Sequence, residues 1–210
     1  MAQTQLYLIR HGQTDWNLRA ALQGRTDIPL NETGRRQAQE ARQRLEGVRF
    51  DAVYSSPLSR AMETAALVSG WPMEKIRADQ RLIEIAFGPY EGKDTHTLGP
   101  AFAPFFADPA SYQPPEGGES LNSVLERTAD FLAFAASQHE GQTLLVAGHG
   151  AALHAMLTAA LANPLEKFWS VSLDNCRVAV LARDTAAPGG WRLIASDGDG
   201  AGEYAKKYLG

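Results

Sequence analysis

Short apolar runs predict six strands along the chain. The two clearest cover residues 5–10 and 143–148, where four consecutive apolar residues come directly before Arg10 and Gly148. A Pro-Gly-Gly turn at residues 188–190 predicts a hairpin between the last two strands. The remaining four runs are shorter and lie at residues 52–54, 76–78, 178–181 and 193–195.

Apolar positions at helical spacing predict four helices between these strands. A helix over residues 31–44 begins at an asparagine, which is a favourable N-cap. Ser56 and Pro57 resemble an N-cap followed by proline at the first helical position, so a second helix is expected directly after them. Two further helices are predicted over residues 120–138 and 151–162.

Residues 93–118 interrupt this regular pattern with several prolines and glycines. Phe102, Phe105 and Phe106 lie among them, which is unusual for a flexible linker. We therefore expect a lid-like excursion that packs over another part of the protein, within one domain formed by residues 1–210. His96 lies in this excursion and is expected to be exposed.

The composition narrows the functional classes. The formal net charge is −4, and a non-specific nucleic-acid binder is usually basic, so no nucleic-acid partner is expected. The single cysteine, Cys176, cannot form an internal disulfide, which favours a reducing compartment. No signal-like segment is visible, and no apolar run approaches the roughly 20 residues that span a bilayer. We expect a cytoplasmic protein that does not act at a membrane, of undefined oligomeric state.

Two of the predicted strands run into a His-Gly pair. His11-Gly12 follows the first strand, and His149-Gly150 follows the strand at residues 143–148. Ligands of open α/β sheets bind at the carboxyl ends of the strands, so these histidines are expected to share a site. Arg10 precedes His11, and its guanidinium suits phosphate oxygens. His139, by contrast, is expected to be solvated at the end of a helix.

Two further residues complete a candidate anion site. Arg60 falls in the first turn of the predicted second helix, where the helix N-terminus already favours anions. Glu84 lies within an apolar segment, and a carboxyl group withdrawn from water is suited to general acid catalysis. His11, His149 and Glu84 are also plausible metal ligands. Two arginines beside them would repel a cation, however, so neither a metal nor a cofactor is expected.

Several blocks, in order along the chain, resemble the histidine phosphatase superfamily, which includes the cofactor-dependent phosphoglycerate mutases. The first block reads Arg-His-Gly-Gln-Thr-Asp-Trp-Asn. In full, the blocks are residues 10–17, 23–24, 27–30, 54–61, 64–65, 84, 87–88, 91–92, 117–120 and 148–150. The resemblance implies an α/β fold, a three-layer α/β/α sandwich around a six-stranded, mostly parallel sheet, as in phosphoglycerate mutases.

The resemblance also implies a role for each matching residue. His11 would be the nucleophile and become phosphorylated, and Glu84 would protonate the leaving oxygen and later deprotonate water. The phosphoryl oxygens would be held by Arg10, Arg60 and His149, with Asn17, Gln23, Gly24 and Gly150 as further phosphate-binding residues. For attack, His11 must be neutral at one nitrogen, so its other nitrogen is expected to donate to a backbone carbonyl. His149 is expected to be protonated beside a phosphate.

Three functions remain compatible with these residues. Glu84 is followed by residues 85–87, Ile-Ala-Phe, where the similar mutases carry basic residues, and Ala151 replaces their asparagine. These departures favour a phosphomonoesterase that hydrolyses a small phosphorylated metabolite, such as α-ribazole phosphate, phosphoserine or a sugar phosphate. The alternatives are a cofactor-dependent phosphoglycerate mutase and a catalytically idle phospho-ligand binding domain. The apolar excursion further predicts a preference for neutral or partly apolar esters.

Overall fold

A computed structural model describes residues 3–196, and its strands form one six-stranded sheet. The strands, in the order in which they lie side by side, are β3 (Arg77–Ala78), β2 (Ala52–Ser55), β4 (Thr143–Gly148), β1 (Gln5–Arg10), β5 (Val178–Arg183) and β6 (Trp191–Ser196). β5 is antiparallel to both of its neighbours, whereas the other pairs are parallel. The expected mostly parallel sheet and the hairpin between β5 and β6 are therefore confirmed.

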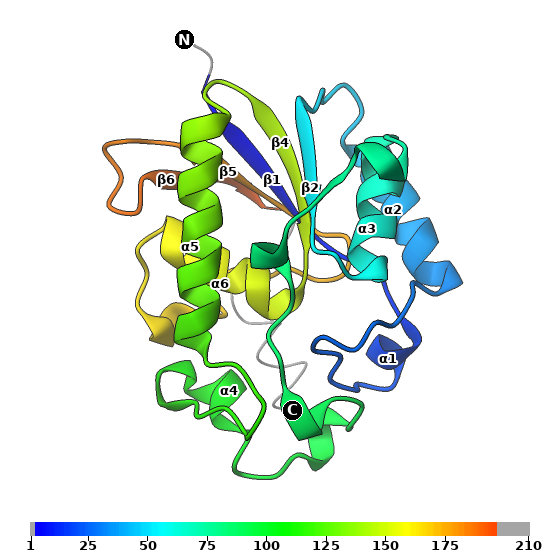
Figure 1. Cartoon of the computed structure of the whole chain (residues 1–210), viewed down its shortest axis with the longest axis vertical. Coiled ribbons are helices and arrows are strands. Elements are labelled where there is room, and N and C mark those ends of the chain that lie inside the picture. The colour runs from blue at the N-terminus through cyan, green and yellow to red at the C-terminus, as the bar shows by residue number, and fades with distance from the viewer. Residues whose placement is uncertain (1–2, 197–210) are drawn as a thin grey trace.

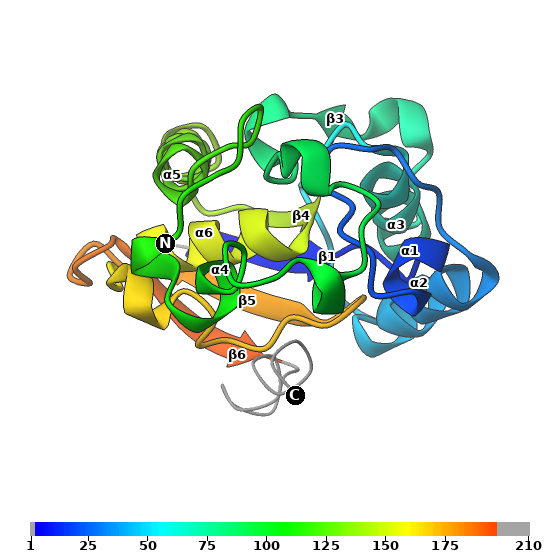
Figure 2. The same ribbon diagram turned by 90° about the horizontal axis from the view of Figure 1, so that it is seen from below.

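The helices cover both faces of this sheet (Figures 1 and 2). The α-helices are α1 (Asp15–Leu18), α2 (Glu32–Arg44), α3 (Ser59–Ser69), α4 (Pro104–Ala107), α5 (Leu121–Gln138) and α6 (Gly150–Ala160). Short 3₁₀ helices are η1 (Met73–Lys75), η2 (Gln80–Leu82), η3 (Gly88–Tyr90), η4 (Thr95–Thr97), η5 (Pro109–Ser111) and η6 (Leu165–Lys167). Because α2 and α3 pack on one face and α5 and α6 on the other, the three-layer α/β/α fold is confirmed.

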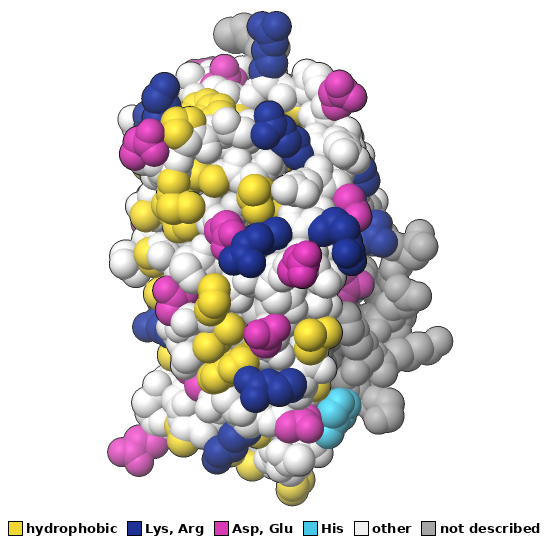
Figure 3. All heavy atoms as spheres, turned by 90° about the vertical axis from the view of Figure 1, so that its right-hand side faces the viewer, with side chains coloured by type: hydrophobic (Ala, Val, Ile, Leu, Met, Phe, Trp, Pro, Cys, Tyr) yellow, Lys and Arg dark blue, Asp and Glu magenta, His cyan; other side chains and the backbone are white. Residues whose placement is uncertain are grey.

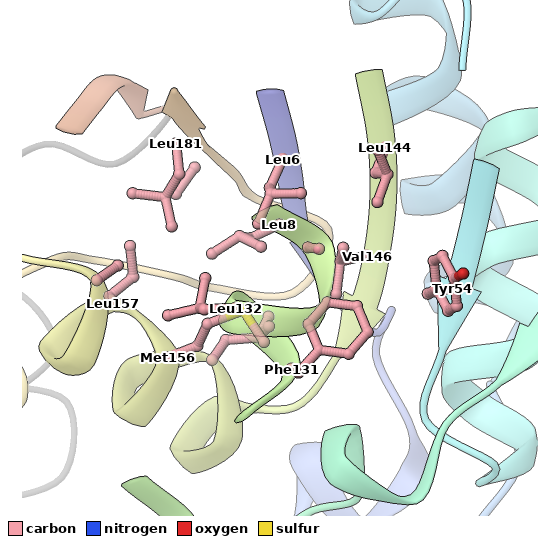
Figure 4. Packing of buried hydrophobic residues seen from close by; sticks show 14 of the residues in the cluster. Leu6, Leu8, Tyr54, Phe131, Leu132, Leu144, Val146, Met156, Leu157 and Leu181 are labelled. Carbon is pink, nitrogen blue, oxygen red and sulfur yellow. The ribbon is translucent and has the colours of Figure 1, made fainter. Parts of the chain in front are cut away.

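The core explains why β1 reads as an uninterrupted apolar run. Leu6 and Leu8 are fully buried in the cluster that contains Phe131 of α5 and Met156 of α6 (Figure 4). Ile9 lies in a different cluster, together with residues of α2 and α3. Successive residues of a strand point to opposite faces, and both faces of this sheet are covered, so every position in the run is apolar.

The register of the strands aligns their carboxyl ends. Arg10, the last residue of β1, pairs with Gly148, the last residue of β4. Ser55, at the end of β2, pairs with Ala147. The residues that follow these strands therefore emerge side by side at one edge of the sheet, and His11 donates its backbone N–H to the carbonyl of Gly148 at 2.9 Å.

The start of α3 differs from the prediction. α3 begins at Ser59, with Leu58 at the N-cap position, so Ser56 and Pro57 do not begin the helix. Instead, Asp27 accepts hydrogen bonds from the backbone N–H of Ser59 at 2.9 Å and from its hydroxyl at 2.8 Å. Asp27, which lies 32 residues earlier in the sequence, thus satisfies the N-terminal end of α3. The Ser56 side chain does not cap the helix, and its contact is described with the site below.

The excursion at residues 93–118 is ordered by its own aromatic cluster. Phe102 and Phe105 are each 2% exposed and pack with Phe87 in a core that is separate from the two cores of the sheet. α4 lies beneath the carboxyl end of the sheet, as Figure 1 shows. His96 is exposed, as expected. Phe102 lies within this core and, unlike Phe105 and Phe106, does not line the pocket described below.

His139 is buried, contrary to expectation. Its side chain is 7% exposed, and its Nε2 lies 2.9 Å from the hydroxyl oxygen of Tyr54 on β2. The end of α5 therefore packs against the sheet, and a hydrogen-bond partner 85 residues away makes burial of a polar ring possible.

The surface over α2 and α3 carries both signs of charge. Figure 3 shows Lys and Arg side chains interspersed with Asp and Glu on this face, and Arg35 of α2 forms an ion pair with Glu63 of α3 at 2.6 Å. This face offers no continuous basic surface of the kind that nucleic acids require. Among the described residues, no helix is both long and apolar enough to cross a bilayer.

Candidate active site

A pocket of about 80 Å³ lies at the carboxyl edge of the sheet. Its lining includes eight of the nine residues that the sequence predicts for the site: Arg10, His11, Asn17, Gln23, Gly24, Arg60, Glu84 and Gly150. The ninth, His149, lies beside it, with its ring centroid 5.2 Å from that of His11. Pockets for drug-sized ligands usually measure about 300–1,000 Å³, so this one suits a compact ligand.

The His11 ring is held as a neutral imidazole, and within residues 3–196 one of its nitrogens has no hydrogen-bond partner. Its Nδ1 lies 2.7 Å from the carbonyl oxygen of Gly12. A carbonyl only accepts hydrogen bonds, so Nδ1 carries the proton and Nε2 keeps its lone pair. Burial lowers the pKa of His11 well below 6.5, and the positive charges of Arg60 and Arg10 lower it further. The expected donation to a backbone carbonyl is therefore present in the structure.

Arg60 places a cation inside the protein. Its side chain is fully buried, and its two terminal nitrogens donate to the carbonyls of Gly24 and Thr26, both at 2.8 Å. Within residues 3–196, no carboxylate lies within ion-pairing distance of it. Burial lowers the pKa of Arg60 to about 10, so the group is still charged at neutral pH. Arg10, which is 6% exposed, adds a second cation and donates to the carbonyl of Leu173 at 3.1 Å.

His149 is oriented by a serine. Its Nε2 lies 2.7 Å from the Ser56 hydroxyl oxygen, and that oxygen also accepts the backbone N–H of Leu58 at 3.3 Å. The Nδ1 of His149 is buried and has no hydrogen-bond partner in the described part of the chain. Burial lowers the pKa of His149 well below 6.5, with Arg60 as the next cause. An anionic ligand would oppose both effects and favour the protonated ring.

The Glu84 carboxylate is fixed at the N-terminus of α6. Its Oε1 accepts backbone N–H groups from Ile85 and Ala152, each at 3.0 Å, and its Oε2 accepts that of Ala151 at 3.2 Å. These donors include two of the N–H groups that a helix leaves unsatisfied in its first turn. The carboxylate is 8% exposed and faces the pocket. Since Oε2 is engaged only once, it is the oxygen that can exchange a proton with a ligand.

The loop that follows α1 also lines the pocket, through residues 20–24. Gly24 has a φ of +52°, which is strained for any other residue, and a Cβ there would displace the Glu91 carboxylate, so this position favours glycine. Glu91 accepts the backbone N–H of Thr26 at 2.9 Å and that of Phe87 at 3.1 Å, which ties the loop to the Glu84 segment. Asn17 uses its Oδ1 to accept the backbone N–H of Thr14 at 3.0 Å, which leaves its amide N–H groups for the pocket.

Three residues with a part in the site were not predicted from the sequence. Ser56 was interpreted as a helix cap, although it contacts His149. Glu91 lies in a matching block but had no assigned role, and its contacts to the loop depend on the fold alone. Trp169 lines the pocket from a segment after α6 that has no periodic pattern. Ser56 and Glu91 carried a signal, namely their places in the family blocks, whereas Trp169 carried none.

The residue types at this site would also allow a metal site as an alternative to an anion site. Within the described ranges, no three His, Cys, Asp or Glu side chains are grouped so that they could hold a metal ion. The pocket instead places two guanidinium groups, a bare imidazole nitrogen and a carboxyl around one small volume. That arrangement defines a site for binding and transferring an anionic group.

Comparison with known proteins identifies the family. Residues 6–195 match the histidine phosphatase superfamily (branch 1). Phosphoserine phosphatase 1 of Hydrogenobacter thermophilus is 33% identical over 180 residues, which cover 84% of this chain and 85% of that protein. Metal-independent phosphoserine phosphatase of Arabidopsis thaliana is 33% identical over 159 residues, or 73% of this chain and 67% of that protein. The chain therefore belongs to the histidine phosphatase superfamily.

The fold comparison agrees. The crystal structure of a mutant phosphoserine phosphatase from Entamoeba histolytica in complex with phosphoserine matches this structure with a TM-score of 0.82 and 30% sequence identity. The match covers 92% of this chain and 96% of that one. The expected class of enzyme, a phosphoric monoester hydrolase with a phosphoglycerate mutase-like fold, is confirmed.

The contact between Ser56 and His149 predicts a catalytic effect of Ser56→Ala. Without the hydroxyl, the His149 ring loses the partner that sets its orientation, and kcat falls about tenfold, less than the loss of an oxyanion donor itself. Steady-state kinetics with p-nitrophenyl phosphate measures this change. The unfolding free energy should fall by about 1 kcal/mol in the same variant, because one buried hydrogen bond is lost.

Ser55→Ala is the matched control for that prediction. Ser55 is also fully buried at the end of β2, but its hydroxyl donates to the Ser56 carbonyl, whereas the hydrogen bond to His149 comes from Ser56. It should lose stability to a similar extent and keep its kcat. An equal fall in kcat in both variants would show that Ser56 only supports the fold.

The lowered pKa of His11 predicts its protonation state below pH 6.5. Burial and two neighbouring cations disfavour the imidazolium, so the neutral ring persists as the pH falls through 6.5. Nitrogen-15 NMR should show a protonated Nδ1 and a bare Nε2 from pH 8 down to pH 6, with His11→Ala assigning the signals. A midpoint at or above pH 6.5 would contradict the prediction.

Proposed function

We propose that this phosphomonoesterase hydrolyses a small phosphorylated metabolite through a phosphohistidine formed on His11. The observation that carries the proposal is the bare Nε2 of a neutral, buried His11 beside two guanidinium groups. Phosphoryl transfer depends mainly on positioning and on neutralising the charge of the equatorial oxygens. Arg10 and Arg60 can supply that charge without a metal ion.

In the first step, the His11 Nε2 lone pair attacks phosphorus and the bond from phosphorus to the ester oxygen breaks. Glu84 gives its proton to that leaving oxygen, so the product leaves as a neutral alcohol. The phosphoryl oxygens are held by Arg10, Arg60 and His149. Asn17, Gln23 and Gly24 contribute from the loop after α1, together with the backbone of Gly150 at the N-terminus of α6.

In the second step, Glu84 acts as the base. It takes a proton from water, the water oxygen attacks phosphorus, and the bond from phosphorus to Nε2 breaks. Phosphate leaves, His11 regains its lone pair, and Glu84 is again protonated. Three backbone N–H groups hold the Glu84 carboxylate, which keeps it in one orientation through both steps.

Hydrolysis is favoured over the mutase reaction by the residues after Glu84. Ile85 is fully buried and Phe87 is 4% exposed, so this segment packs into the aromatic core and presents no cation to a second anionic group. A bisphosphorylated glycerate would need such a cation. The pocket's positive groups are those that would surround a single phosphoryl group.

A catalytically idle binding domain is less compatible with the geometry. Binding would need the arginines alone. This site also fixes the nucleophilic nitrogen of His11 at the end of β1 and the carboxyl of Glu84 at the start of α6. The single cysteine, Cys176, is a buried free thiol, which supports the proposed cytoplasmic location. Phosphoserine, the substrate in the names of the relatives above, is one member of the proposed class of small phosphorylated metabolites.

The proposed nucleophile predicts the outcome of His11→Ala. Turnover should fall by about 10⁴-fold or more, as for the loss of a covalent nucleophile in other enzymes. Acid quench of the unaltered enzyme during turnover should trap a phosphoryl group on His11 that is acid-labile and base-stable. His96→Ala is the control, because His96 is exposed and does not line the pocket. A phosphoryl group on serine or aspartate would overturn the mechanism.

The role of Glu84 predicts a dependence on the leaving group. Glu84→Gln keeps the size of the side chain but cannot donate the proton, so alkyl phosphates should lose about 10²–10⁴ in kcat. p-Nitrophenolate needs little protonation and should suffer much less. Kinetics on both esters gives the comparison, and equal losses would assign Glu84 a structural role only.

A further inference from the structure

The residue after His11 is a glycine that packing requires. A Cβ on Gly12 would lie 2.5 Å from the backbone carbonyl oxygen of Gly34 on α2, too close for any side chain unless the backbone shifts. Glycine is also the residue whose backbone rotates most freely. The close approach of α2 therefore places a residue with few conformational restrictions of its own directly beside the proposed nucleophile.

The direction of the peptide between Gly12 and Gln13 decides which nitrogen of His11 carries the proton. Its carbonyl oxygen lies 2.7 Å from Nδ1 and can only accept, so Nδ1 is protonated and Nε2 is bare. If this peptide turned over, its N–H would face Nδ1 in place of the carbonyl. Nδ1 would then accept, the proton would lie on Nε2, and the nitrogen proposed to attack phosphorus would lose its lone pair.

Two side chains from neighbouring helices hold this peptide and the one before it. The Oε1 of Gln37, on α2, accepts the backbone N–H of Gln13 at 2.9 Å. Because the N–H and the carbonyl of a trans peptide point in opposite directions, this bond keeps the carbonyl turned toward His11. The Oγ1 of Thr64, on α3, accepts the backbone N–H of Gly12 at 3.0 Å. Both N–H groups that flank the rotatable glycine backbone are therefore fixed by side chains.

Thr64 also joins the His11 loop to the helix that carries Arg60. Its hydroxyl donates to the carbonyl of Arg60, one turn earlier in α3, at 2.7 Å, which leaves the oxygen lone pairs for the Gly12 N–H. The carbonyl of His11 accepts the side-chain amide of Asn175 at 2.8 Å, so the peptide between His11 and Gly12 is held at both of its polar groups. Thr64 is 0% exposed and His11 is 3% exposed, and hydrogen bonds withdrawn from water are electrostatically stronger.

We propose that Gln37 and Thr64 are positioning residues that keep the Gly12 carbonyl turned toward His11 and so select the tautomer with a bare Nε2. The catalytic consequence of this assignment rests on the proposed function, in which Nε2 attacks phosphorus. The residues that line the pocket do not include Gln37 or Thr64. Each therefore acts through the backbone of the His11 loop and not on the substrate.

Gln37→Met tests the bond to the peptide after Gly12. Methionine keeps the length of the side chain, but its thioether is only a weak acceptor for the Gln13 N–H. The ratio of the Nδ1–H to the Nε2–H tautomer of His11 should fall by about tenfold, the effect of a backbone donor left without its partner. Nitrogen-15 NMR of histidine-labelled enzyme measures this ratio. With p-nitrophenyl phosphate, kcat should fall about tenfold and KM should change less than about twofold, since the proposed phosphate-binding groups are unaltered.

Gln37→Glu and Gln39→Met are the paired controls. A carboxylate still accepts the Gln13 N–H, so Gln37→Glu should keep the Nδ1–H tautomer and most of kcat. Gln39 is exposed two residues further along α2, so Gln39→Met should change neither quantity. If Gln37→Met keeps the tautomer ratio of the unaltered enzyme, the assignment of Gln37 is overturned.

Thr64→Val tests the second bond with a side chain of nearly the same shape. The tautomer ratio should shift in the same direction by about fivefold, and Thr64→Ser, which keeps the hydroxyl, should restore it. Thr128→Val is the matched control, because Thr128 is also fully buried on a helix, α5, and donates to the carbonyl four residues earlier, that of Val124, at 2.8 Å. It should lose stability and keep the ratio. An unchanged ratio in Thr64→Val would overturn the assignment of Thr64.

The outcomes separate this proposal from the proposed function. If no phosphoryl group can be trapped on His11, the proposed function fails, and the nitrogen-15 spectra still decide whether Gln37 and Thr64 set the tautomer. If His11 is phosphorylated but neither variant shifts the tautomer ratio, the proposed function stands and the positioning assignment is overturned. A shift in the ratio together with a lower kcat in Gln37→Met, both reversed in Gln37→Glu, would support the two proposals together.

Discussion

Burial of the Arg60 guanidinium is the constraint on which the rest of the site depends. A charge withdrawn from water is destabilising unless other groups solvate or neutralise it. The carbonyls of Gly24 and Thr26 solvate Arg60, which fixes the course of the loop that carries them. Glu91 accepts a backbone N–H of the same loop and another from the segment of Glu84, and so joins the two. The proposed phosphate-binding loop and the placement of Glu84 therefore depend on the same buried charge.

The sequence predicted those parts of the fold that depend on local pattern. β1 and β4 are apolar at every position between their first and last residues, and the asparagine before α2 caps that helix as expected. His11 and His149 could be placed together because each follows such a strand. The start of α3 could not be predicted from Ser56, since its cap is Asp27 from another loop. Contacts of this kind, like those of Trp169, exist only after the chain has folded.

The part of the pocket that Phe105 and Phe106 line is supported by a core of its own. Phe102 and Phe105 pack with Tyr112 and Phe168 in a cluster that is separate from the two cores of the sheet. The residues proposed to hold the phosphoryl group lie instead at the end of β1 and at the starts of α3 and α6. Side chains of the excursion can thus change without disturbing the strands that position His11. The fold thus supports the proposed catalytic residues and the aromatic part of the pocket on separate cores.

The strand order also has a consequence for how the chain is made. β1 is synthesised before every other strand, yet in the sheet it lies between β4 and β5, whose residues come more than 130 positions later. Contacts between such distant segments slow folding, because the intervening chain must be ordered first. During translation, the apolar residues of β1 therefore stay unpaired until β4 and β5 have been synthesised. In that period they are prone to aggregation or to binding by chaperones. The pairing that brings His11 next to His149 makes the active site a late product of biosynthesis.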